Sequence, residues 1–290
     1  MEPTPARTML LRYGLAPSRE RGQNFLVDPN VARKVVDAVA PADDELVVEI
    51  GSGFGAITFG LAERAAHVVC VEYDAGIVRA FREEYGRPDG VTLVEGDALE
   101  FDLRSAAREH GVPRVVVAGN LPYNLTSPVI RLLIGSKEVV SRAIIMVQRE
   151  VADRLLADPG TPSYSALTAV VAFHARIRAH FAVRRTCFHP RPAVDSKVVE
   201  MGFLSAPKRS ADPRTYSDVV HAAFGKRRKM LRQALADVAE GAGVGVERLG
   251  TDAGLDLERR GETLSVEEFE RLALAVSGAQ AGSGSRGGRE

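Results

Sequence analysis

The stretch "VVEIGSGFGAIT" (residues 47–58) determines how the rest of the chain can be interpreted. Its apolar beginning is typical of a buried strand, and a glycine-rich turn follows immediately. Gly51, Gly53 and Gly55 allow the backbone to bend sharply there and to approach a ligand closely. A helix-like segment comes next, so the stretch predicts the first strand, turn and helix of an α/β sheet.

The segments around this stretch continue the alternation. Strands are predicted at 45–50, 67–72, 91–96, 114–120 and 142–147. Helices are predicted at 31–40, 56–65, 75–85, 104–110 and about 128–134. Alternation of this kind implies β-α-β crossovers, and therefore a doubly wound, mostly parallel sheet with a Rossmann-like α/β fold.

The pattern becomes helical after Ser205, which predicts a smaller, all-helical C-terminal domain and a boundary near 204–212. The tail "SGAQAGSGSRGGRE" (277–290) is too rich in Gly and Ser to bury a core. We therefore predict four parts: a flexible N-terminal arm at 1–20, a main domain at 21–206, a helical domain at 207–277 and a disordered tail at 278–290.

Composition restricts the class of protein. None of the apolar runs in the 290 residues reaches the length of a membrane span, and the N-terminus lacks the apolar stretch of a signal peptide. The two cysteines, Cys70 and Cys187, stand alone in the sequence, so neither a disulfide framework nor a metal site is predicted. These features predict a protein of the reducing cytoplasm with no membrane partner.

The net charge of zero conceals an uneven distribution. Residues 173–232 contain 14 Lys and Arg against 4 Asp and Glu, so this window has a net charge of +10 and the remainder −10. Such a division indicates that one part of the molecule holds a polyanionic partner.

Acidic residues follow two of the predicted strands. Glu72 ends a strand 21 residues after Gly51, the spacing at which an acid hydrogen-bonds a ribose, and Asp97 ends the next strand and could bind an exocyclic amine. The turn reads G-S-G-F-G rather than G-x-G-x-x-G, which disfavours NAD. S-adenosylmethionine fits better because it has a ribose and an adenine but no phosphate. The alternative is three unrelated turns, since Gly and Asp are common turn residues.

The fourth strand ends in "NLPY" (120–123), at the same edge of the sheet. The exocyclic amine of adenine is a poor nucleophile, because its lone pair is delocalised into the ring. The side-chain oxygen of Asn120 and a backbone carbonyl near Leu121 or Pro122 could accept its two N–H bonds and direct the lone pair at a methyl donor. Tyr123 could stack on the base. Catalysis would then consist of positioning and electrostatics. The alternative is a plain turn after a strand.

With these motifs in place, the chain resembles the ribosomal RNA adenine N6-dimethyltransferase family, whose members are class I methyltransferases. The similarity runs from about residue 21 to 276, and "NLPYN" together with "FHPRPAVDS" (188–196) is its most specific part. The branch it resembles dimethylates two adjacent adenosines near the 3′ end of small-subunit rRNA. The chain departs from the family at Ser52, where proline is common, and at Ser165, where glycine is frequent.

The resemblance implies a role for individual residues. Asn24 and Leu26 would close over the donor, Gly51 and Gly53 would contact it, Glu72 would bind its ribose and Asp97 its adenine amine. Asn120 would hold both the donor and the target amine, and Leu121, Pro122 and Tyr123 would complete the pocket. Phe188 would stack on the target adenine from the side opposite Tyr123.

Basic residues of the +10 window are the predicted RNA contacts. One group surrounds Phe188, a mixture of charge and aromaticity suited to unpaired bases, and the other lies on a predicted helix. The predicted RNA-binding residues are Arg184, Arg185, Arg191, Lys226, Arg227, Arg228, Lys229 and Arg232. A run of this kind is usually a solvated face, and the surrounding charge favours phosphate contacts here.

The sequence therefore predicts a monomeric enzyme that uses S-adenosylmethionine to dimethylate small-subunit (16S) rRNA, free or in a pre-small-subunit particle. Two alternatives stay open: a large-subunit (23S) rRNA adenine methyltransferase that confers macrolide resistance, and a non-catalytic RNA-binding assembly factor. A DNA adenine methylase is disfavoured, because those enzymes have an Asp-Pro-Pro-Tyr type motif.

Overall fold

The computed structural model describes residues 1–18, 20–203, 209–226 and 228–284. The chain divides into two compact units. The first unit comprises Met1–Ala152 and Arg176–Phe203, and the second, called here the helical unit, comprises Asp153–Ala175 and the described residues after 203.

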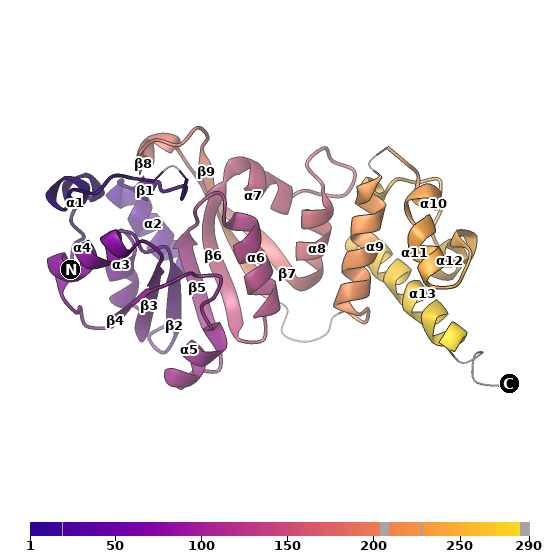
Figure 1. Cartoon of the computed structure of the whole chain (residues 1–290), viewed down its shortest axis with the longest axis horizontal. Coiled ribbons are helices and arrows are strands. Elements are labelled where there is room, and N and C mark those ends of the chain that lie inside the picture. The colour runs from indigo at the N-terminus through magenta and orange to yellow at the C-terminus, as the bar shows by residue number, and fades with distance from the viewer. Residues whose placement is uncertain (19, 204–208, 227, 285–290) are drawn as a thin grey trace. The chain divides into compact units, whose positions relative to one another are not determined.

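A seven-stranded sheet forms the centre of the first unit, with the strand order β4-β3-β2-β5-β6-β9-β7 (Figure 1). Its strands are β2 (Leu46–Ile50), β3 (His67–Glu72), β4 (Val91–Glu95), β5 (Val115–Asn120), β6 (Val140–Gln148), β7 (Ala175–Val183) and β9 (Ser196–Phe203). Two short strands, β1 (Phe25–Leu26) and β8 (Phe188–His189), pair antiparallel beside it.

The pairings confirm the predicted mostly parallel, doubly wound sheet. Strand β2 pairs in parallel with both β3 and β5, β3 with β4, and β5 with β6, whereas β9 runs antiparallel to β6. The chain leaves β2 on one side toward β3 and returns on the other as β5. The carboxyl end of β2 is therefore the topological switch point, where open α/β sheets bind ligands.

Helices connect the parallel strands, as the alternating pattern predicts. These connections are α3 (Thr58–Ala62), α4 (Ala75–Tyr85), α5 (Leu103–Glu109) and α6 (Thr126–Gly135), whereas α2 (Pro29–Val39) precedes β2 and α7 (Arg149–Leu155) follows β6. Asp28, Asp74 and Asp102 cap α2, α4 and α5 by accepting backbone N–H groups of the first turn. Each cap fixes where a helix begins, and so where the preceding strand end is held.

Helices α2 and α3 bury their apolar sides on one face of the sheet. Val35 and Val36 of α2 and Leu61 of α3 pack in one cluster with Val47 and Val116 of the strands. Residues adjacent to these in the strands point to the opposite face. Because all five residues of β2 are buried, both faces of the sheet are covered there.

The N-terminal arm is folded, which corrects the prediction of flexibility at 1–20. Helix α1 (Ala6–Arg12) buries Met9 completely and Leu10 almost completely, in a cluster with Phe25 and Phe54. Glu84 of α4 accepts hydrogen bonds from Thr4, Arg12 and Tyr13. The apolar residues of "ARTMLLR" (6–12) are spaced along one face of a helix, and this pattern is the local signal for α1.

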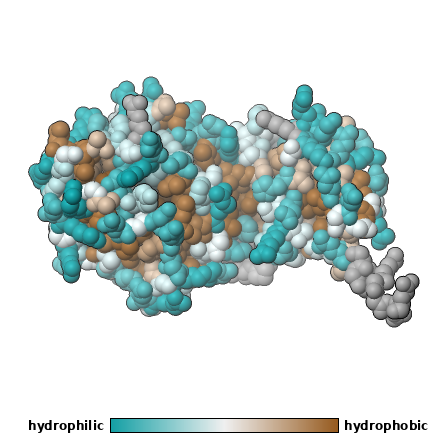
Figure 2. All heavy atoms as spheres, viewed as in Figure 1, coloured by the Kyte–Doolittle hydropathy of each residue, from teal (hydrophilic) through white to brown (hydrophobic). Residues whose placement is uncertain are grey.

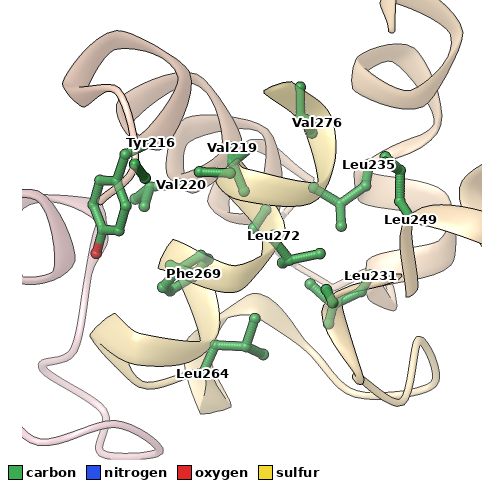
Figure 3. Packing of buried hydrophobic residues seen from close by; sticks show 14 of the residues in the cluster. Tyr216, Val219, Val220, Leu231, Leu235, Leu249, Leu264, Phe269, Leu272 and Val276 are labelled. Carbon is green, nitrogen blue, oxygen red and sulfur yellow. The ribbon is translucent and has the colours of Figure 1, made fainter. Parts of the chain in front are cut away.

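The helical unit has its own core. Its helices are α8 (Ala166–His174), α9 (Pro213–Gly225), α10 (Leu231–Ala234), α11 (Ala236–Gly241), α12 (Val246–Ala253) and α13 (Val266–Gly284). Figure 3 shows apolar side chains gathered between these helices, among them Leu231, Leu249, Phe269 and Leu272. Tyr216 is buried among them and donates its hydroxyl to the carbonyl of Ala169.

The parts predicted from sequence differ from these units in two respects. Asp153–Ala175 belongs to the helical unit rather than to the main domain, because Tyr164 and Phe173 pack in the helical core. Helix α13 continues through Gly284, so 278–284 are helical where a disordered tail is predicted. Residues 204–208, within the predicted boundary, and 285–290, within the predicted tail, lie outside the described residues.

Ser165, a departure from the family pattern, has a clear local role. It caps α8 in an extended conformation (φ −148°), and its hydroxyl accepts the backbone N–H of Thr168. Glycine is therefore not required at this position.

Hydrophilic and hydrophobic residues are interspersed on the face shown in Figure 2. Among the helices described, none combines the length and the apolar character needed to cross a membrane.

Candidate active site

A cavity of about 210 Å³ lies at the carboxyl ends of β2 and β5, the switch point of the sheet. Several segments of the chain meet there, among them residues 3–6, the β1 region, the glycine-rich turn after β2, and the ends of β3 and β5. The predicted residues among its lining are Asn24, Leu26, Gly51, Gly53, Glu72, Asn120, Leu121, Pro122 and Tyr123.

The glycine-rich turn has the backbone that its composition predicts. Gly51 and Gly53 adopt φ angles of 74° and 55°, in the left-handed region that favours glycine. A Cβ on Gly53 would lie 3.2 Å from the ring of Phe25, so a side chain there would also crowd β1. Ser52 between them is 4% exposed, and its hydroxyl has no hydrogen-bond partner among the described residues.

Glu72 is held rigidly beside this turn. One of its carboxyl oxygens accepts the backbone N–H of Gly53 at 2.9 Å, and the other accepts that of Asp74 at 3.0 Å. Burial raises the pKa of Glu72, and the two backbone N–H groups oppose that shift. The turn and the carboxyl group are therefore one hydrogen-bonded unit.

Glu49 also lines the cavity, although it was not selected from the sequence. It is 2% exposed, and its Oε2 accepts hydrogen bonds from the Thr58 hydroxyl (2.6 Å) and the Cys70 thiol (3.5 Å). Burial raises the pKa of Glu49 to about 7. The available signal was a single acid within the apolar run "VVEI", since an unpaired acid in a buried strand is rare.

Asn120 ends β5 with a defined amide orientation. Its Nδ2 donates to the backbone carbonyl of Asn24 at 2.8 Å, which leaves Oδ1 available as an acceptor. The side chain of Asn24 in turn donates to the carbonyl of Gly22 at 3.0 Å. The orientation is therefore set by the β1 region, 96 residues earlier in the chain.

The rest of the "NLPY" segment continues along the cavity. Leu121 is 1% exposed and donates its backbone N–H to the carbonyl of Met146 in β6. The carbonyl of Pro122 accepts the N–H of Leu125, whereas that of Leu121 has no partner among the described residues. Tyr123 is half-buried and shares a hydrogen bond of 3.1 Å with Ser196. Of the two backbone carbonyls considered, Leu121 therefore offers the free acceptor.

Asp97 and Phe188 do not line the cavity. Asp97 follows β4, and its Oδ1 accepts the backbone N–H of Leu99 at 2.8 Å. Phe188 is 2% exposed and packs in the core cluster beside Leu26, its partner across the β1–β8 pair. The roles predicted for these two residues stay predictions, and Phe188 would have to leave the core cluster to stack on a base.

The predicted RNA-binding residues fall into two groups, one in each unit. Arg184, Arg185 and Arg191 are exposed around β8. The described members of the second group, Lys226, Arg228, Lys229 and Arg232, are also exposed, whereas Arg227 lies outside the described residues.

The second group does not lie on one helix, contrary to the prediction. Helix α9 ends at Gly225 and α10 begins at Leu231, so most of the group lies in the connection between them. Lys226 pairs with Asp237, and Arg232 with Glu247 and Glu258. For Arg228 and Lys229 the structure gives no ion pair within the described ranges.

The chain matches the family model described as "Ribosomal RNA adenine dimethylase" over residues 17–272. It is 39% identical to the "Ribosomal RNA small subunit methyltransferase A" of Moorella thermoacetica, over 94% of this chain and 98% of that protein. It is 40% identical to the protein of the same name from Pelotomaculum thermopropionicum, over 93% of this chain and 95% of that protein.

Two solved structures resemble the fold. The dimethyladenosine transferase from Plasmodium falciparum superimposes with a TM-score of 0.73 at 23% identity, over 87% of this chain and 97% of that one. The 23S rRNA methyltransferase ErmE superimposes with a TM-score of 0.65 at 22% identity, over 87% and 99%.

Proposed function

The chain belongs to the ribosomal RNA adenine dimethylase family, and from that premise we propose that it methylates N6 of adenosines in small-subunit rRNA. S-adenosylmethionine is the methyl donor. The finer proposal is that two adjacent adenosines in a loop near the 3′ end of 16S rRNA each receive two methyl groups, as a step in small-subunit biogenesis.

Two features of the cavity suit this donor. The backbone at Gly51 borders open space, because a Cβ there would have only the Asn120 carbonyl within 4 Å. A ligand can therefore come close to the glycine-rich turn. Among the described residues that line the cavity, three are acidic (Asp28, Glu49 and Glu72) and none is Lys, Arg or His. Such a lining favours a ligand with positive charge.

The free acceptor on Asn120 is the observation that carries the proposal. Because Nδ2 is bound to Asn24, Oδ1 can accept one N–H of the target amine, and the unpartnered carbonyl of Leu121 can accept the other. These bonds draw the nitrogen toward tetrahedral geometry and direct its lone pair. When bound, the donor supplies a methyl group on a positively charged sulfur. The chain's own contribution is positioning, so no strong base is required.

Access to the target base sets the substrate requirement. A stacked adenine cannot reach the cavity, so we propose that the base is in a loop or is flipped out. Tyr123 would stack on it. Phe188 would do so from the other side only if it leaves the core cluster in which it is 2% exposed. Arg184, Arg185 and Arg191 are near Phe188 in the sequence and would contact the flanking phosphates.

Asn120→Ala tests the proposal. We expect methyl transfer to rRNA to be lost while S-adenosylmethionine still binds, because the variant removes an acceptor for the target amine. Transfer would be measured with tritiated donor, and binding by calorimetry. Asn124→Ala is the matched control, because Asn124 is exposed and does not line the cavity. Undiminished turnover in Asn120→Ala would refute the assigned role.

Mapping of the product separates the remaining candidates. Mass spectrometry of rRNA from a deletion strain should show loss of methyl groups from 16S rRNA only. Loss from 23S rRNA would instead identify a large-subunit methyltransferase, and no loss would identify a non-catalytic assembly factor. We propose further that a monomer acts in the cytoplasm, on free rRNA or on a pre-small-subunit particle. Parallel assays with both substrates and sedimentation of the enzyme would test this.

A further inference from the structure

Glu49 is a cavity residue without a role in the proposed reaction, and the inference below rests on that proposed function. The hydrogen bonds from Thr58 and Cys70 both end on Oε2. Among the residues that the structure describes, none donates a hydrogen bond to Oε1. The second carboxyl oxygen is therefore available to a ligand in the cavity that Glu49 lines.

The ionisable groups that act on Glu49 are the Cys70 thiol and the Glu72 carboxyl group. Cys70 lies beside it on β3, and burial raises the pKa of that thiol well above its ordinary value, so it stays neutral. Glu72, also on β3, acts on Glu49 by charge repulsion. Helix α3 contributes the Thr58 hydroxyl, which cannot titrate, and α2 contributes Asp28 to the cavity, where it caps the helix.

The charge of the donor bears directly on this carboxyl group. S-adenosylmethionine has a sulfonium and an ammonium group, and a cation near a buried carboxyl favours its ionised form. Among the described residues, no Lys, Arg or His lines the cavity to neutralise that carboxylate. The ligand itself is then the counter-ion.

We propose that Glu49 keeps its proton while the cavity holds no donor and releases it to solvent when S-adenosylmethionine binds. The exchange is balanced: a neutral carboxylic acid and a cationic ligand give a carboxylate paired with that cation, and one proton leaves. Two consequences follow. Donor affinity rises with pH through neutrality, and loss of the donor's positive charge on methyl transfer removes part of what holds the carboxylate ionised.

Calorimetry in paired buffers measures the released proton. At pH 7, S-adenosylmethionine would be titrated into the full-length protein in phosphate and in Tris, whose ionisation enthalpies differ. The dependence of the observed heat on buffer gives the number of protons released. With the pKa of Glu49 at about 7, we expect roughly half a proton for the wild type. Donor affinity should rise roughly tenfold between about pH 6 and pH 8.

Glu49→Gln keeps an acceptor for Thr58 and cannot ionise. We expect it to bind the donor more weakly, with no proton release and no rise in affinity with pH. Glu95→Gln is the matched control, because Glu95 is exposed at the end of β4 and lies outside the cavity, and it should behave as the wild type. Release of the same number of protons by Glu49→Gln and wild type would overturn the inference.

Thr58→Val provides an independent test if Glu49→Gln does not fold. The Thr58 hydroxyl lowers the pKa of Glu49, so its removal should move the midpoint of the affinity profile to higher pH, and an unchanged midpoint would contradict the inference. Absence of donor binding in either buffer would instead refute the proposed function. Binding without Glu49-dependent proton release would overturn this inference alone.

Discussion

At Gly119 a side chain would collide with the neighbouring strand. A Cβ there would lie 2.4 Å from the carbonyl oxygen of Ile50. This contact lies between β5 and β2, one residue before Asn120. Because Gly119 has no side chain, the ends of these two strands can lie close to each other. The carboxyl edge of the sheet, and with it the cavity, depends on that close approach.

Gly119→Ala should therefore destabilise the first unit and displace Asn120. We expect a loss of about 2–3 kcal/mol in the free energy of unfolding, in the range of overpacked cores, and a larger fractional loss of methyl transfer than of donor binding. Urea unfolding followed by circular dichroism would measure the first. Gly96→Ala is the control, because a Cβ there has no neighbour within 4 Å. Equal stability of the two variants would contradict this account.

Glu49 gives a second prediction at this scale, on stability. Its pKa is about 7 in the folded protein against an ordinary value of 4.5, so the folded state holds the proton over a pH range in which the unfolded state has lost it. The stabilisation is fully present below about pH 4.5 and is lost as the pH rises through about 7, by up to about 3 kcal/mol.

Glu49→Gln removes that dependence. We expect the difference in unfolding free energy between wild type and variant to change by up to about 3 kcal/mol between about pH 4.5 and pH 7. The wild type should lose stability relative to the variant as the pH rises. Denaturant unfolding at several pH values would measure the difference. A difference that is constant with pH would show that Glu49 titrates normally.

The residues of the site were predictable to different extents. Gly51, Glu72 and Asn120 stand at strand ends, and strand ends can be located by alternation, so their meeting in one cavity was predictable. Glu49 was missed although a single acid within an apolar strand is a rare pattern, because its hydrogen bonds with Thr58 and Cys70 are visible only in the fold. The packing of Phe188 in the core was also out of reach, because it depends on the pairing of β8 with β1.

Among the elements, α1 has the clearest structural role. It supplies Ala6 to the cavity, and Met9 and Leu10 to the cluster around Phe54 of the glycine-rich turn. An element that packs on that turn stabilises the conformation in which the cavity exists. A helix of seven residues is not stable in isolation, so α1 depends on this packing.

Met9→Ala should cost about 2–4 kcal/mol of unfolding free energy, because it leaves a void at a residue that is 0% exposed. It should also weaken donor binding through the glycine-rich turn. Leu11→Ala, on the same helix at 86% exposed, should leave both unchanged. Urea unfolding of both variants would measure the unfolding free energy, and calorimetry with S-adenosylmethionine would measure donor binding. A flexible arm, as predicted from sequence, would make the two substitutions equivalent.

Helices and strands were predicted correctly where the apolar residues repeat with one regular spacing, and incorrectly where one element ends and the next begins. Strand β3 at His67–Glu72 and helix α4 at Ala75–Tyr85 occur as predicted, since their apolar spacing is regular and Asp74 marks the helix start. In the run "GKRRKMLR" (225–232), seven residues with good helix propensity follow a glycine, and α9 ends at that glycine, Gly225. Glycine is about 1 kcal/mol less favourable than alanine in a helix, so the sequence did contain a local signal for this helix end.

At the scale of the whole molecule, we propose that the two separately packed units contribute different interactions to one RNA. The first unit holds the cavity and the exposed Arg184, Arg185 and Arg191, and the helical unit exposes Arg228 and Lys229. Charge asymmetry predicted the polyanionic partner from sequence. The boundary between the two units was less predictable from the sequence. Asp153–Ala175 belongs to the helical unit through contacts with residues that follow it by dozens of positions.

Salt dependence tests this division. If about six phosphates are neutralised, log affinity for a single-stranded rRNA segment should fall with log salt with a slope near −4. Arg228→Ala with Lys229→Ala should make the slope less steep by roughly 1.4, because it removes two cations that form no ion pair with the described residues, and should leave donor binding unchanged. Arg64→Ala is the control, since Arg64 already pairs with Asp37. Filter binding across a salt series would measure all three proteins. An unchanged slope in the double variant would mean that the helical unit meets RNA through other residues.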